Sequence, residues 1–138
     1  MLRKILTTLG SLIMIGFGVW HFTVPAAWSW YSYITPSATE LVLAVGAINI
    51  FFSLCLVLIG IMNLIFMFTR QSRFVLIVTL TLSTLLWAVR TALQIVYPQG
   101  SINVWLQYGM LSAFVLTLIC FAVSLIIVMS NKGKGGSV

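Results

Sequence analysis

Acidic side chains are almost absent from this 138-residue chain, in which Glu40 stands alone against seven Lys and Arg residues. Charged residues make up 6% of the sequence, whereas a soluble domain carries about a quarter. Disorder is excluded as well, because a disordered chain needs low hydrophobicity and 62% of these residues are apolar. The composition therefore excludes an ordinary soluble globule and leaves no room for a separate soluble domain.

Side chains that carry general acid–base chemistry are equally scarce. Besides Glu40, the chain offers one histidine, His21, and two cysteines, Cys55 and Cys120. Both cysteines lie inside apolar runs and do not form a metal-binding pair of the CxxC type. We predict no metal site and assign no catalytic residue, so the sequence leans against an enzyme. The basic residues flank apolar runs instead of forming a solvated patch, which argues against a nucleic-acid partner.

Four apolar segments fill most of the chain, at about residues 5–24, 40–68, 74–97 and 102–129. Each reaches the length of about 20 residues that a helix needs to cross a bilayer. Membrane β-strands would instead need alternating segments of about 10 residues. The predicted fold class is an all-α membrane protein, an antiparallel four-helix transmembrane bundle. Residues 1–130 would form one domain, followed by a flexible tail over 131–138.

Basic residues predict how the bundle is oriented. They occur at the N-terminus (Arg3, Lys4), in the polar turn at 69–73 and in the tail at 132–134. By the positive-inside rule both termini should be cytoplasmic, and the loops at 25–39 and 98–101 should face outward. We expect Pro25 to end the first helix. An alternative is that the first segment is a signal peptide cleaved near Val24-Pro25-Ala26.

The loop after the first segment is rich in aromatic residues, with Trp28, Trp30, Tyr31 and Tyr33. Aromatic rings with a polar edge favour the headgroup layer. The loop is therefore expected to be an interfacial anchor, with a lid over a ligand as the alternative.

Ionisable or amide side chains at membrane depth need a reason, because they are costly there. Arg90 lies about 10 Å below the outer end of the third helix, and Gln94, four residues further on, shares its face. His21 lies near the outer end of the first helix, Glu40 opens the second, and Asn49 lies below Glu40. Antiparallel threading would bring His21, Glu40, Arg90 and Gln94 into one outward-facing layer. We predict that they form a polar cluster or ligand site, with Asn49 as the floor of an outer cavity. The predicted aromatic lining comprises Trp20, Trp87 and Tyr97.

Each member of this layer also has a structural interpretation. Ser37-Ala38-Thr39-Glu40 fits a capping box, although Glu40 is also the natural partner for Arg90. Arg90 alternatively snorkels to the interface. His21 is either a hydrogen-bonded structural histidine, a proton-active group, or an axial ligand to haem or a pigment. Small and polar residues at helical spacing, such as Asn49, Ser53, Gly60 and Asn63, are expected to pack helices together.

The stretch His21-Phe22-Thr23-Val24-Pro25, followed by Glu40-Leu41, resembles the DoxX-like group of small four-helix bacterial membrane proteins. Members of that group often close their first helix with His-Phe-x-x-Pro and open the second with Glu-Leu. The resemblance covers about residues 10–100 and implies a bacterial inner-membrane bundle with both ends inside. It singles out His21, Pro25 and Glu40, and some relatives are associated with thiosulfate or quinone oxidation. Asn49 stands where the group often has an acidic residue.

The leading functional hypothesis is a non-catalytic membrane component. It would be an accessory subunit of a larger membrane complex or homo-oligomer, or would bind a small amphiphile such as a lipid or quinone in the polar cavity. The first alternative is a quinone-linked redox protein using His21, Glu40 and Arg90. The second alternative is a small transporter or channel. The sequence leaves the cofactor open: a quinone is one candidate, and haem or pigment bound through His21 is less favoured.

Overall fold

The computed structural model describes residues 1–35, 37–100 and 103–130, which contain four long helices and no strand. Helix α1 spans Leu2–Ala27, α2 Thr39–Phe68, α3 Arg73–Val96 and α4 Val104–Ser130, and a short 3-10 helix, η1, spans Trp30–Tyr33. Each of the four long helices is long and apolar enough to cross a membrane. The prediction of four long apolar helices is confirmed. The tail predicted over 131–138 lies outside the described residues.

The first helix does not end where the sequence predicted. α1 continues through Pro25 to Ala27, so the prediction that Pro25 closes it is wrong. Proline has no N–H to donate to the carbonyl four residues earlier, which belongs to His21. The side chain of Asn49 on α2 fills that gap, donating from Nδ2 to the His21 carbonyl oxygen at 3.1 Å. Such a replacement bond from a neighbouring helix allows a proline inside an apolar helix.

Side-chain caps begin two of the helices. Ser72 Oγ accepts a hydrogen bond from the Val75 amide at 3.3 Å at the start of α3. Asn103 Oδ1 accepts from the amides of Trp105 and Leu106 at 3.1 and 3.3 Å at the start of α4. Both satisfy amides that a helix leaves without partners. By contrast, α2 begins after Ala38 with no side-chain cap, so the predicted capping box of Glu40 is not formed.

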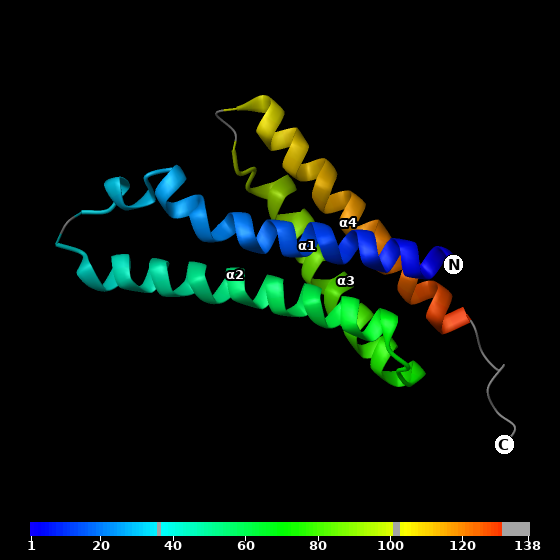
Figure 1. Cartoon of the computed structure of the whole chain (residues 1–138). Helices are drawn as coiled ribbons and strands as arrows, with labels where there is room; N and C mark the ends of the chain where they lie inside the picture. The colour runs from blue at the N-terminus through cyan, green and yellow to red at the C-terminus, as the bar shows by residue number, and fades with distance from the viewer. Residues whose placement is uncertain (36, 101–102, 131–138) are drawn as a thin grey trace, which may run out of the picture.

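Helix α1 is central to the bundle. It packs against both α2 and α4, α3 packs mainly against α4, and α2 and α3 meet at few positions. Figure 1 shows α1 between α2 and α4 in the view, with the N-terminus beside the last turns of α4. Buried hydrogen bonds tie these helices together, from Thr7 Oγ1 to Ser124 Oγ at 3.0 Å and from Asn63 Nδ2 to Ser83 Oγ at 2.7 Å.

Glycines bring α1 and α2 into close contact. A Cβ added at Gly18 would lie 2.9 Å from the Ser53 carbonyl oxygen, and one added at Gly60 would lie 3.2 Å from the Ser11 carbonyl oxygen. Small residues allow such an approach of two backbones. All four members of the α2 stripe, Asn49, Ser53, Gly60 and Asn63, are buried as the spacing predicted.

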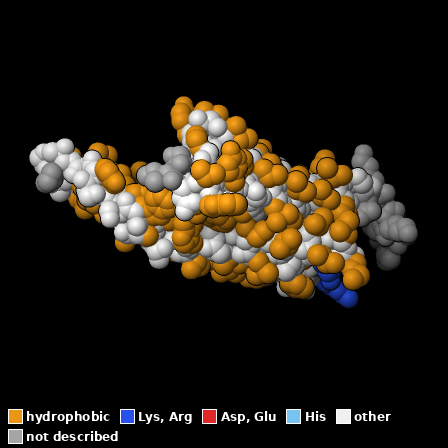
Figure 2. All heavy atoms as spheres, turned by 90° about the horizontal axis from the view of Figure 1, so that it is seen from above, with side chains coloured by type: hydrophobic (Ala, Val, Ile, Leu, Met, Phe, Trp, Pro, Cys, Tyr) orange, Lys and Arg blue, Asp and Glu red, His pale blue; other side chains and the backbone are white. Residues whose placement is uncertain are grey.

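The interior mixes apolar side chains with small polar ones, while the exterior is mostly apolar. Thr7, Ser11, Ser53 and Ser124 are fully or almost fully buried, together with larger side chains such as Phe114 and Phe121. Leucine, isoleucine, valine and phenylalanine side chains cover the outside, and Figure 2 shows this apolar face with basic side chains at one end only. A soluble monomer does not expose apolar area on this scale, whereas lipid-facing helices do.

Candidate functional site

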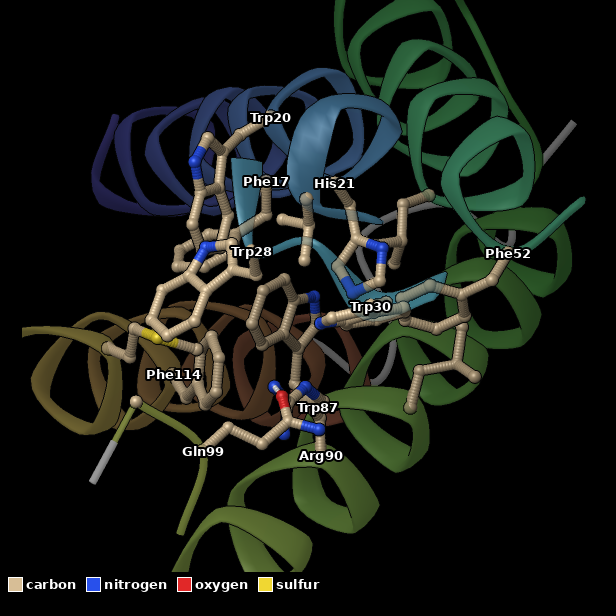
Figure 3. Close-up of a pocket in the computed structure, with 15 residues that line it drawn as sticks. Phe17, Trp20, His21, Trp28, Trp30, Phe52, Trp87, Arg90, Gln99 and Phe114 are labelled. Carbon is tan, nitrogen blue, oxygen red and sulfur yellow. Dashed lines mark hydrogen bonds between the residues drawn. The ribbon is translucent and has the colours of Figure 1, made fainter. Parts of the chain in front are cut away.

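A cavity of about 310 Å³ lies where all four long helices contribute side chains. Its volume is at the lower end of the range for small-molecule sites, about 300–1,000 Å³. Seven of the 15 lining residues are aromatic, and Figure 3 shows their rings around the cavity. The aromatic members are Phe17, Trp20, Trp28, Trp30, Phe52, Trp87 and Phe114. The wall therefore suits a flat or chain-like apolar group.

One side of the cavity is a set of interlocked rings. Phe17 makes edge-to-face contacts with Trp20 at 5.8 Å, with Trp87 at 5.9 Å and with Phe114 at 4.9 Å between ring centroids. Trp87 lies 5.5 Å from Phe114. Such pairs favour offset or perpendicular geometry, and each adds about 0.5–1.5 kcal/mol beyond the burial of area. These contacts hold the rings of this part of the wall against one another.

His21 projects from α1 into the cavity (Figure 3). Its ring has three aromatic neighbours, with centroids at 5.0 Å for Phe52, 6.3 Å for Trp30 and 6.5 Å for Trp20. Its Nδ1 atom is buried and has no hydrogen-bond partner among the described residues. Its main-chain carbonyl, by contrast, accepts from Asn49. The imidazole is thus held by packing, and its Nδ1 atom is enclosed by the surrounding protein.

Arg90 reaches the cavity from α3. Its Nη2 donates to Gln99 Oε1 at 2.6 Å, and its Cζ lies 4.3 Å from the centroid of the Phe114 ring. A guanidinium over an aromatic face gains about 0.5–2 kcal/mol from the ring quadrupole. These contacts hold the charge at the cavity wall without an acidic partner.

The loop that carries Gln99 is tied down by Gln94. Gln94 Nε2 donates to the Gln99 carbonyl at 3.0 Å, and Gln94 Oε1 accepts from the Gln99 amide at 3.4 Å. Gln94 is 2% exposed and is not among the cavity-lining residues. Its amide is therefore occupied in fixing the loop, and Gln99 is the residue that faces Arg90.

The predicted polar cluster assembles only in part. His21 and Arg90 line the same cavity, together with the predicted aromatic residues Trp20 and Trp87. Asn49 does not line the cavity but hydrogen-bonds the main-chain carbonyl of His21, which does. Glu40 is exposed and is not among the lining residues. Within the described part of the chain, Arg90 hydrogen-bonds Gln99 and no ion pair joins it to Glu40.

The separation of Glu40 from the cavity has a simple geometric cause. Asn49, nine residues further along α2, already lies level with His21 through its hydrogen bond. Nine residues of helix rise about 13 Å, so Glu40 lies well beyond that level. The predicted three-residue group of His21, Glu40 and Arg90 is therefore not formed.

A second hollow of about 350 Å³ adjoins the cavity between α2 and α3. It shares His21, Phe52, Arg90 and Gln99 with the cavity and adds Leu93 and Tyr97. Tyr97 was predicted to line the site, and the structure places it here, 71% exposed. The hollow lies along the side of the bundle where α2 and α3 make few contacts.

Sequence reasoning missed several lining residues. Phe17 precedes His21 by one helical turn, so helical spacing could have identified it. Trp28 and Trp30 were recognised as an aromatic loop and assigned to the interface first, with a lid as the alternative. Both line the cavity, on either side of Ser29, whose positive φ of 51° turns the chain. Phe114 and Gln99 carried no signal, because only the packing of α4 and the loop brings them in.

The donor set does not indicate a metal centre. Within residues 1–35, 37–100 and 103–130, there is no group of three His, Cys, Asp or Glu side chains able to hold a metal ion. What the cavity offers instead is a guanidinium, an imidazole and indole N–H groups in an aromatic wall. Trp87 Nε1 is buried and, like His21 Nδ1, has no partner among the described residues. Asn49 Oδ1, outside the cavity wall, is a third buried atom of this kind.

Comparison with protein-family models, with curated proteins and with solved structures finds no match for this chain.

Proposed function

We propose that this protein is a multi-pass membrane protein that binds a small amphiphile in the aromatic cavity. One observation carries the proposal: the Arg90 guanidinium lies in the wall of a cavity whose other lining residues are mostly aromatic or aliphatic. A ligand with an apolar body and a polar oxygen would contact the apolar part of this wall and accept a hydrogen bond from Arg90. The role would be that of a binding protein or an accessory subunit of a larger membrane complex, as the sequence predicts.

The proposed orientation has antiparallel neighbours and both termini on the cytoplasmic side. It is supported by the hydrogen bond between Thr7 and Ser124, which pairs the start of α1 with the end of α4. It is also supported by Arg73, which donates to the carbonyls of Val128 and Met129 near the end of α4. Arg3, Lys4 and Arg70 then lie toward the same side, as the positive-inside rule requires. A bacterial inner membrane follows from the DoxX-like resemblance and remains a prediction.

The experiment is to extract the protein in mild detergent and identify co-purifying small molecules by mass spectrometry. Leu86 lines the cavity and Leu85, its neighbour on α3, does not. Leu86→Trp should fill the cavity and lose the bound molecule. Leu85→Trp is the matched control, because residue 85 is 59% exposed on the outside, and it should retain the molecule. A wild-type protein that carries no small molecule, or equal loss in both variants, would contradict the proposal.

A quinone-linked redox protein is the second candidate. It is favoured by the aromatic wall and by Arg90, since a quinone is a flat ring with carbonyl oxygens that accept hydrogen bonds. Glu40 is left out of this version of the site, because it is not among the lining residues. An absorption spectrum of the purified protein before and after a chemical reductant discriminates the two. A quinone would lose its ultraviolet band on reduction, and a lipid would leave the spectrum unchanged.

A further inference from the structure

The charge of the cavity is unbalanced. Arg90 is a cationic member of its wall, and the described lining residues include no carboxylate. Glu40 is the only acidic residue of the chain and is exposed at the start of α2. A charge in an apolar site is costly unless it is paired. Arg90 is partly buried, and its partners among the described residues, the Gln99 amide and the Phe114 ring, are both neutral.

Gln99 occupies the place where such a partner would bind. Its Oε1 accepts from Arg90 Nη2 at 2.6 Å, while its main chain is fixed by Gln94. A neutral amide oxygen is a weaker acceptor than an anionic oxygen, because charge-assisted hydrogen bonds are about twice as strong as neutral ones. An anionic ligand would thus displace the Gln99 side chain without disturbing the loop.

Size and access narrow the class of ligand. A volume of about 310 Å³ holds a small head and part of one chain, and it is too small for a two-chain lipid. The adjoining hollow shares Arg90 with the cavity, adds Leu93 and Tyr97, and lies on the side of the bundle where α2 and α3 make few contacts. A chain too long for the cavity would extend into this hollow.

From these observations we infer that the cavity selects a single-chain monocarboxylate, such as a fatty acid. Its carboxylate meets Arg90 in place of Gln99 and lies within reach of the other polar atoms of the wall. Its chain lies against the aromatic rings and leaves between α2 and α3. This inference rests on the proposed function and adds the sign of the ligand's charge.

The test uses two brominated probes that differ only in charge, dibromostearate and its primary amide, dibromostearamide. Bromine quenches tryptophan fluorescence on contact, and four of the five tryptophans line the cavity, namely Trp20, Trp28, Trp30 and Trp87. The fifth, Trp105, is 89% exposed and would report on probe dissolved in the surrounding lipid. The measurement is therefore made on the full chain carrying Trp105→Phe, in nanodiscs of uncharged lipid and in alkaline buffer.

We expect saturable quenching by both probes, with the carboxylate binding at least about tenfold more tightly. Arg90→Gln should remove this preference while keeping the affinity for the amide, and Arg90→Lys should retain part of it. Arg70→Gln is the matched control, because it removes an exposed arginine outside the cavity, and it should leave the preference unchanged. Gln99→Ala should tighten binding of the carboxylate several-fold, because the competing amide oxygen is gone.

The outcomes separate the inference from the proposed function. If neither probe gives saturable quenching, the cavity does not bind such amphiphiles and the proposed function fails with the inference. If both probes bind equally well, the proposed function stands and the inference is overturned. A preference that survives Arg90→Gln, or a Gln99→Ala variant that binds the carboxylate no better, would also overturn it.

Discussion

The hydrogen bond from Asn49 to the His21 carbonyl makes a specific prediction about stability. Pro25 cannot donate to that carbonyl, and Asn49 on α2 does so instead at 3.1 Å. Asn49 is 6% exposed, so the bond is shielded from water. Replacing Asn49 by leucine should therefore leave the carbonyl without a donor, while Pro25→Ala should restore the N–H that the helix lacks.

A double-mutant cycle of Asn49→Leu and Pro25→Ala gives the free energy that this hydrogen bond contributes. A buried acceptor that loses its partner costs about 1–3 kcal/mol. The Asn49→Leu change also removes Oδ1, which has no partner among the described residues, and this partly offsets the loss. That offset is the same with or without Pro25, so it cancels in the cycle. We expect Asn49→Leu to cost about 1 kcal/mol more beside Pro25 than beside alanine, which is roughly fivefold in the unfolding equilibrium.

The assay is reversible unfolding in mixed micelles with increasing dodecyl sulfate, followed by far-ultraviolet circular dichroism. Ser53→Ala is the matched control, because Ser53 lies one turn along the same face and its hydroxyl donates within α2 to the Asn49 carbonyl. It should cost the same in both backgrounds. Equal costs for Asn49→Leu beside proline and beside alanine would refute the assigned role of this amide.

Two further substitutions test the helix contacts by the same assay. Gly18→Ala should destabilise the protein by about 1–3 kcal/mol through overpacking, because its Cβ would lie 2.8 Å from Val57 and 2.9 Å from the Ser53 carbonyl oxygen. Gly16→Ala, with nothing within 4 Å of the added atom, should instead be neutral or up to about 1 kcal/mol stabilising; equal stability of the two variants would contradict the close approach of α1 and α2. Asn63→Leu removes the 2.7 Å hydrogen bond to Ser83 and should lower the free energy of unfolding by about 0.6 kcal/mol, the average for hydrogen bonds between membrane helices. The double variant Asn63→Leu, Ser83→Ala should be as stable as Asn63→Leu alone.

The sequence predicts the helices well because long apolar runs have few other ways to satisfy their backbone in an apolar environment. It predicts the buried stripe of α2 for a related reason, since small residues at helical spacing favour close packing. The end of α1 could not be predicted, because the donor that compensates for Pro25 comes from Asn49, far along the chain. The sequence shows where a proline lies, but not which distant side chain donates to the carbonyl that the proline leaves without a partner.

The candidate site was predicted less completely. Counting residues from the helix ends correctly placed His21 and Arg90 beside one cavity. The same counting placed Glu40 at the level of these two residues. In the structure Asn49 is level with His21, and Glu40 lies nine residues before Asn49 on α2, well beyond that level. Gln99 was missed because loop conformation decides which side chain turns back onto Arg90.

The distribution of contacts among the helices has a consequence for how the chain assembles. α1 packs with α2 and α3 with α4, and the two pairs join chiefly through α1 and α4. Each pair is contiguous in sequence, and the exposed residues Thr69 and Arg70 separate them. The molecule is in this sense two hairpins, and a chain divided after Arg70 retains every contact within each half. Two such fragments produced together in one cell should find each other and rebuild the cavity, whose wall needs side chains from both.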